Sequence, residues 1–177
     1  MKKLLVLFVV SLVIISCQKK VDELPPATQS GANTFGAKVN GNMWVPTSSP
    51  LPGAAKLEAG YIANGVIIHA RNLASTPTET EFEFFIQNPD TGTFTLNTDT
   101  QIYPNQTGNY GYYILRKINP LSEWITTSQI GGSINITRYD NVNHIISGTF
   151  QFDAVTINGN PDTLHVTEGR FDIKINI

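Results

Sequence analysis

Two neighbouring stretches near the C-terminus decide the fold: residues 144–157, HIISGTFQFDAVTI, and residues 164–177, LHVTEGRFDIKINI. Pairing Phe150 with Phe171 in an antiparallel register places apolar residues opposite one another along both stretches. The further pairs are Ile146 with Ile175, Val155 with Val166 and Ile157 with Leu164, while Phe152 faces Gly169. Opposed side chains on one face stabilise a sheet, so this register predicts a hairpin.

The run before this hairpin fits the same strand from its other side. Ile136 falls opposite Ile146, and Gly132 falls opposite Phe150. A strand with a partner on each side is central in its sheet. The last third of the chain therefore predicts a three-stranded antiparallel meander.

The apolar positions of both C-terminal stretches change face at the same level, near residues 153–154 and 167–168. A bent hairpin that changes which layer it covers has this pattern, as at the corner of a sandwich or barrel. Gly169 beneath Phe152 would allow the bend.

Length and composition indicate one globular domain behind an N-terminal leader. Of the 177 residues, 41% are apolar and 15% are charged, with 14 Gly and 10 Pro, which is typical of a folded, turn-rich chain. The net charge of −2 argues against nucleic acid as a partner. The single cysteine excludes an intramolecular disulfide.

The N-terminus has the order of an export signal: Lys2 and Lys3, an apolar run over residues 4–15, then Ser16 and Cys17. The run is too short to span about 30 Å of hydrocarbon. An ordinary signal peptide with a chance cysteine is the alternative to a lipoprotein leader.

The leader resembles a bacterial lipoprotein signal, in which the cysteine receives lipid and becomes the new N-terminus. Ile14 stands where that class usually has Leu. The resemblance implies a signal peptide over residues 1–16 and a membrane anchor through lipid on Cys17. Residues 17–33 then form a polar, flexible tether, and residues 34–177 form the domain.

Two Asn-Gly pairs predict type I′ hairpin turns, at Asn40-Gly41 and Asn64-Gly65. The first places Trp44 opposite Ala37, which is ordinary core packing; a stacking platform for a sugar is the alternative. The second places Tyr61 opposite Ile68, with His69 on the more polar face as a surface histidine.

Residues 79–86 alternate strictly, with Glu79, Glu81 and Glu83 on one face and apolar residues on the other. Neighbours two apart on a strand lie about 6.6 Å apart, which is wide for a calcium site. A solvated strand face that blocks edge pairing is therefore the better interpretation.

Residues 101–113, QIYPNQTGNYGYY, are the strongest candidate for ligand recognition, because tyrosines among Gly and Asn are typical of adaptable binding loops. The candidate ligand contacts are Tyr103, Tyr110 and Tyr112, together with Trp44. Half-buried strand tyrosines are the alternative.

The sequence lacks the motifs of catalysis: it has no Gly-rich phosphate loop, no paired metal-binding histidines and no Gly-x-Ser-x-Gly turn. One carboxylate pair, Asp153 opposite Glu168, is the only catalytic candidate. We therefore expect no enzyme, no cofactor and no metal.

The predicted loop over residues 158–163 carries Asp162-Thr163-Leu164 near its tip. This triplet resembles the short signal for O-glycosylation of exported Bacteroidota proteins, which would modify Thr163. A plain loop that matches by chance is the alternative.

The leader, TFGAKVNGNMW at residues 34–44, ISGTFQFDAV at 146–155 and VTEGRFDIKI at 166–175 resemble an uncharacterised family of Bacteroidota lipoproteins. The resemblance implies a lipoprotein of the cell envelope, in the outer membrane on its periplasmic face or at the cell surface. It assigns no functional residue.

We expect an all-β fold, an antiparallel β-sandwich or flattened β-barrel of about nine strands. The expected function is a non-enzymatic binding or structural module whose partner is a glycan, a peptide or another envelope protein. A lipocalin-like carrier of a small apolar ligand is the alternative.

Overall fold

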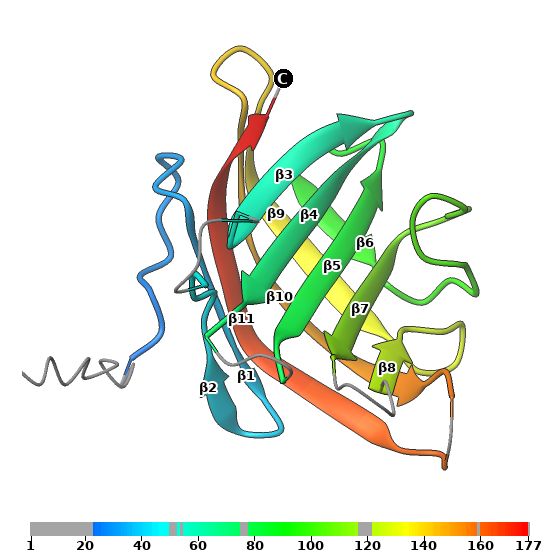
Figure 1. Ribbon diagram of the computed structural model, residues 1–177. Helices are drawn as coiled ribbons and strands as arrows, with labels where there is room; N and C mark the ends of the chain where they lie inside the picture. The colour runs from blue at the N-terminus through cyan, green and yellow to red at the C-terminus, as the bar shows by residue number, and fades with distance from the viewer. Residues whose placement is uncertain are drawn as a thin grey trace, which may run out of the picture.

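The computed structural model describes residues 23–49, 53, 55–74, 78–116, 122–158 and 160–176 (Figure 1). These ranges contain strands and turns and no helix. The eleven strands are β1 (Thr34–Val39), β2 (Asn42–Trp44), β3 (Leu57–Ile62), β4 (Gly65–Asn72), β5 (Thr80–Gln87), β6 (Gly92–Thr95), β7 (Tyr110–Leu115), β8 (Ser122–Ile125), β9 (Gly132–Asp140), β10 (Ile145–Thr156) and β11 (Thr163–Asn176).

All eleven strands belong to one sheet, in the order β2-β1-β11-β3-β4-β5-β7-β8-β10-β9-β6. An additional pairing of β10 with β11 completes a ring of hydrogen bonds through seven strands. The predicted all-β class is confirmed. The sheet is mixed rather than purely antiparallel, because β3 runs parallel to the end of β11.

The strands form two facing layers around an aromatic core, with β3, β4, β5 and β7 in front of β9 and β6 (Figure 1). Phe82 and Phe84 of the front layer meet Phe150 and Phe152 of the back layer, and no ring of the four exposes more than 4% of its surface. The centroids of Phe84 and Phe150 lie 4.8 Å apart. Interleaved rings from both layers therefore fill the space inside the ring of strands.

The predicted meander of β9, β10 and β11 is confirmed, but its registers are wrong by two to three residues. Phe150 lies opposite Gly169 rather than Phe171, and Gly148 lies opposite Phe171. On the other side, Ile134 rather than Gly132 faces Phe150.

Aromatic–glycine pairs explain this register. A Cβ atom on Gly169 would collide with the ring of Phe150, so the ring covers the glycine directly. The rings of Phe150 and Phe171 still share a face, with centroids 6.3 Å apart. Phe150 and Phe171 therefore each lie opposite a glycine instead of opposite one another, because a side chain at the glycine position would occupy the space of the ring.

The predicted change of face occurs in β11 alone. The register slips between Phe150 and Phe152 because β11 carries one extra residue there, and Glu168 takes a φ of 53°. In β10, Ala154 stays buried on the same face as Phe152. The predicted opposition of Asp153 and Glu168 is consequently wrong, since Asp153 faces His165.

The first predicted hairpin is confirmed and the second is displaced. Asn40 and Gly41 have φ values of 48° and 78°, and Ala37 faces Trp44. In the second hairpin the turn lies one residue earlier, so Tyr61 faces Val66 rather than Ile68.

Residues 23–33, here named the N-terminal strap, lie against β11 and were predicted to be part of the tether. The carboxylate of Asp172, which has no exposed surface, accepts hydrogen bonds from the strap. The strap donors are the hydroxyl groups of Thr28 and Ser30 and the backbone N–H groups of Ser30, Gly31 and Ala32. The docked part of the chain therefore begins before residue 34.

Candidate functional site

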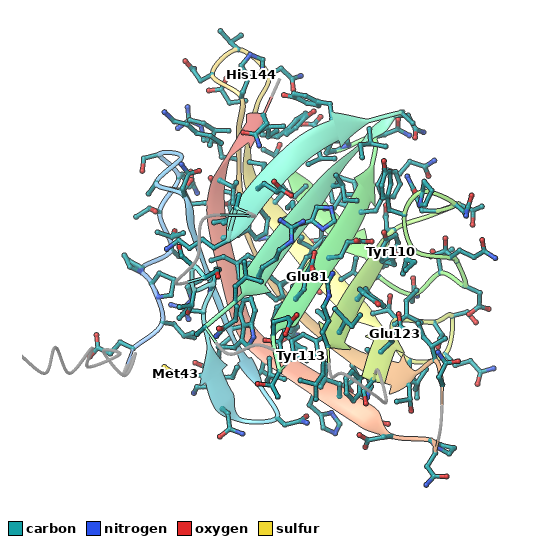
Figure 2. All side chains as sticks on the ribbon, viewed as in Figure 1. Met43, Glu81, Tyr110, Tyr113, Glu123 and His144 are labelled. Atoms are coloured by element: carbon teal, nitrogen blue, oxygen red, sulfur yellow. The ribbon has the colours of Figure 1, made fainter. Side chains whose placement is uncertain are left out.

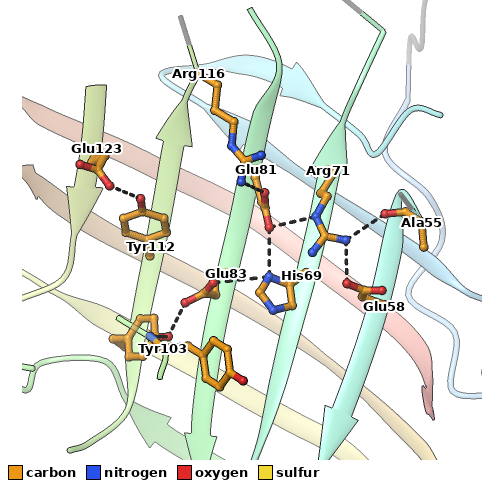
Figure 3. A network of polar contacts seen from close by, with 11 residues as sticks. Ala55, Glu58, His69, Arg71, Glu81, Glu83, Tyr103, Tyr112, Arg116 and Glu123 are labelled. Atoms are coloured by element: carbon orange, nitrogen blue, oxygen red, sulfur yellow. Dashed lines mark hydrogen bonds and ion pairs between the residues drawn. The ribbon is translucent and has the colours of Figure 1, made fainter. Parts of the chain in front are cut away.

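The outer face of β4, β5 and β7 carries a network of charged side chains (Figure 3). Glu81 lies at its centre and accepts hydrogen bonds from Arg71 Nε at 3.0 Å and Arg116 at 2.7 Å. Arg71 also binds Glu58 at 2.7 Å. Both glutamates of β5 are buried, Glu81 at 6% and Glu83 at 9% exposure, so the predicted solvated face is wrong at these two positions.

These glutamates tolerate burial because each has partners on the neighbouring strands. Burial alone would raise the pKa of Glu81, but the hydrogen bond from His69 and the charges of Arg71 and Arg116 hold it below its ordinary value. Glu81 therefore stays ionised and links three strands as a compensated buried charge.

His69, predicted as a surface histidine, is mostly covered. Its Nδ1 lies 3.0 Å from Glu81 and 3.4 Å from Glu83, so this nitrogen carries a proton shared between two acceptors. The three residues offer atoms within 4.8 Å of one another, as a metal site would. Two arginine charges on Glu81 oppose a cation there, so the cluster is best explained as structural.

Tyr110 and Tyr112 lie beneath residues 96–109, here named the covering loop. The Tyr110 hydroxyl donates to Glu83 and accepts from the backbone N–H of Tyr103 at 2.8 Å. The Tyr112 hydroxyl donates to Glu123 at 2.5 Å. Burial and the nearby carboxylates raise the pKa of both phenols, so they remain protonated donors.

A groove of about 360 Å³ opens between the covering loop and the ends of β8 and β10, and we name it the apolar groove. It is lined by Thr100, Gln101, Ile102, Tyr103, Asn105, Glu123, Ile125 and Ile157. Tyr103 and Ile157 are among the most exposed large apolar side chains of the described residues, at 44% and 46%. Figure 2 shows Glu123 on the same side of the molecule as Tyr110 and Glu81.

The predicted ligand contacts occupy different environments. Trp44 lies in the core, 7% exposed, and its indole N–H donates to Thr80 at 2.7 Å. Tyr110 and Tyr112 are buried, whereas Tyr103 presents its ring to the apolar groove. Sequence reasoning missed Ile157 and Glu123, because nothing in the sequence indicates that β8 and the end of β10 lie beside the covering loop.

Two modification sites stay predictions. Thr163, predicted to lie in the loop over residues 158–163, is the first residue of β11 and is half-buried, while Pro161 and Asp162 of the loop are exposed. Cys17, the predicted lipidation site, lies outside the described residues. Within the described ranges, no helix has the length and apolar character needed to cross a membrane.

Comparison with known proteins gives one match. Residues 31–173 match the model of the family described as Domain of unknown function (DUF6252). The search of curated proteins and the search of solved structures returned no significant match. The matched segment begins within the N-terminal strap and ends in β11.

Proposed function

The chain belongs to the family Domain of unknown function (DUF6252), and from this premise we propose that it is a non-enzymatic binding module of the cell envelope that captures a peptide segment of another envelope protein. The apolar groove is the proposed recognition site. The observation that carries the proposal is the exposed pair Tyr103 and Ile157 beside an acidic side chain.

The chemistry of the groove favours a peptide with an apolar side chain next to a basic one. Ile102, Ile125 and Ile157 offer aliphatic contact, and Tyr103 adds a ring that loses little conformational entropy on binding. Glu123 accepts hydrogen bonds from Tyr112 and Asn158 but makes no ion pair with any described residue. An unpaired carboxylate at the wall of an apolar groove attracts a Lys or Arg of the ligand.

The proposed location rests on the leader. Residues 2–17 have the order of a lipoprotein signal, which supports lipid attachment at Cys17 and residence in the outer membrane, on its periplasmic face or at the cell surface. A membrane-held domain meets other envelope proteins at high local concentration, so a small groove is sufficient for useful binding.

The aromatic core supports a binding module over a carrier of a small apolar ligand. A carrier needs an internal cavity, whereas Phe35, Phe82, Phe84, Phe150 and Phe152 fill the space between the layers. On the outer face, the cluster of His69, Glu81 and Glu83 most resembles a catalytic site. Ion pairs from Arg71 and Arg116 neutralise Glu81, which supports a structural role for this cluster.

Site-specific photocrosslinking tests the proposal. Benzoylphenylalanine in place of Tyr103 is irradiated in native membranes, and the crosslinked segment is identified by mass spectrometry. The same probe at Val142, 85% exposed at the β9–β10 turn, is the matched control. We expect a partner at Tyr103 that is absent at Val142.

The captured segment is then synthesised as a peptide and titrated against the purified protein. Glu123→Gln keeps an acceptor for Tyr112 but removes the charge, so it and Ile157→Ser should each weaken binding about tenfold. The same crosslinks at both positions, or a peptide affinity that Ile157→Ser leaves unchanged, would overturn the proposal.

A further inference from the structure

A second groove lies on the outer face of β9, β10 and β11, and none of its lining residues belongs to the covering loop. It measures about 540 Å³ and we name it the polar groove. It is lined by Ala27, Ser133, Asn135, Thr149, Phe150, Gln151, Glu168, Gly169 and Arg170. Ala27 of the N-terminal strap forms one wall, and strands β9, β10 and β11 form the floor.

Polar side chains cross the floor in rows perpendicular to the strands. Asn135 of β9 faces Thr149 of β10, which faces Arg170 of β11. A second row pairs Ser133 with Gln151. Neighbouring strands lie about 4.8 Å apart, close to the length of one ring in an extended sugar chain, so successive rings would each meet a polar side chain.

The neutral members of these rows are available to a ligand. Ser133, Thr149 and Gln151 make no side-chain hydrogen bond within the described part of the chain, and the Asn135 amide nitrogen has none either, while its oxygen accepts from Thr93 at 3.2 Å. Hydroxyl and carboxamide groups both donate and accept hydrogen bonds. Sugar hydroxyls require that same dual capacity from a binding site.

Arg170 gives the polar groove an unbalanced positive charge. Its guanidinium makes only long hydrogen bonds to backbone oxygens, 3.4 Å to Glu168 and 3.5 Å to Pro25, and no ion pair with any described carboxylate. The neighbouring carboxylate of Glu168 is already neutralised by Lys38 at 2.6 Å. A planar guanidinium with free donors is suited to a ligand carboxylate.

We propose that the polar groove binds an acidic oligosaccharide, a chain of sugar rings that carries carboxylates, lying across β9, β10 and β11. The neutral rows hold its hydroxyl groups and Arg170 holds one carboxylate. A phosphate-rich ligand would need more cations than this single arginine supplies. An apolar peptide finds little here beyond Ala27 and the edge of Phe150.

Titration calorimetry of the full chain in detergent tests this site with two matched probes. The acidic probe is a β-1,4-linked mannuronic acid trimer, and its neutral counterpart is β-1,4-linked mannotriose. We expect the acidic trimer to bind about tenfold more tightly, the effect of one charge-assisted pair. Arg170→Gln should abolish that difference, and Gln151→Ala should weaken both probes.

Tyr103→Ala in the apolar groove is the control and should leave the affinity of the acidic trimer unchanged. The oligosaccharide site and the proposed peptide site are therefore tested independently of one another. Backbone amide shifts on titration provide a readout that needs no variant and should concentrate in β9–β11. Absence of binding, equal affinity for both trimers, or shifts confined to residues 96–109 would overturn the assignment.

Discussion

Removing the carboxylate of Asp172 tests whether the N-terminal strap is part of the folded domain. Gly31 N–H and the Ser147 hydroxyl donate buried hydrogen bonds of 2.7 Å each to Oδ1. The other strap donors are partly exposed, so water replaces Asp172 there at little cost. A hydrogen bond to a charged group contributes roughly 1.5–3 kcal/mol, so Asp172→Ala should lower the free energy of unfolding by about 3–6 kcal/mol.

Urea unfolding measures that loss, and amide hydrogen exchange locates it. Exchange at residues 30–32 should rise in Asp172→Ala, because their N–H groups lose their acceptor. Asp153→Ala is the control, since that aspartate is half exposed and, among the described residues, its carboxylate pairs with His165 alone. The reasoning is refuted if Asp172→Ala costs under about 1 kcal/mol, or if exchange in the strap stays unchanged.

The same carboxylate gives a pH dependence with a definite sign. Burial opposes ionisation of Asp172, but hydrogen bonds from Thr28, Ser147, Ser30 and Ala32 outweigh it and hold its pKa below the ordinary value. Its stabilisation is therefore complete above about pH 4, the unfolded pKa, and is lost as the pH falls towards the lower folded pKa. The wild-type chain should lose more stability than Asp172→Ala over this acidic range in urea titrations at stepped pH.

Three further outcomes follow from the packing, the covering loop and the leader. Phe150→Ala should cost about 3–5 kcal/mol in urea unfolding because the ring is buried against both layers, and a loss below about 1 kcal/mol would contradict that packing. Tyr110→Phe should lower the free energy of unfolding by about 1–3 kcal/mol and speed hydrogen exchange at the Tyr103 amide, because Glu83 and that amide both lose a hydrogen-bond partner. Unchanged exchange would show that other contacts hold the covering loop in place. Cys17→Ala should move the protein out of the membrane fraction, and a cleaved variant that stays there would exclude the lipid anchor.

The position of a hairpin turn was predictable from its Asn-Gly pair only where the glycine has no other role than to form the turn. Asn40-Gly41 occupies two positive-φ positions, so its turn and register followed from the sequence. The turn predicted at Asn64-Gly65 was misplaced because Gly65 is needed for packing: a Cβ atom there would lie 2.6 Å from the Phe85 ring. The turn moves back one residue, and Ala63 adopts a φ of 49°.

The candidate sites were predictable only in part, because they join segments that are distant in the sequence. Tyrosine content identified residues 101–113, and Tyr103 does line the apolar groove. Its partner Ile157 belongs to the far end of the chain and carries no local signal. The burial of Glu81 could not be predicted either. The alternating pattern shows which side of the strand the glutamates occupy, but it does not show which side chains of neighbouring strands cover that side.

Strand β11 has a consequence for when this protein can fold. It pairs with β3 and β10 to close the ring, so residues as far apart as Ala59 and Ile175 must meet, and outside the ring it pairs with β1, which brings Thr34 opposite Asp172. Until β11 is synthesised, β1, β3 and β10 each lack one of their neighbouring strands. Such non-local pairing makes folding slow, in the range of milliseconds to seconds, and places it after synthesis. Export through a translocation channel, which the leader predicts, requires an unfolded chain, and slow folding is compatible with that requirement.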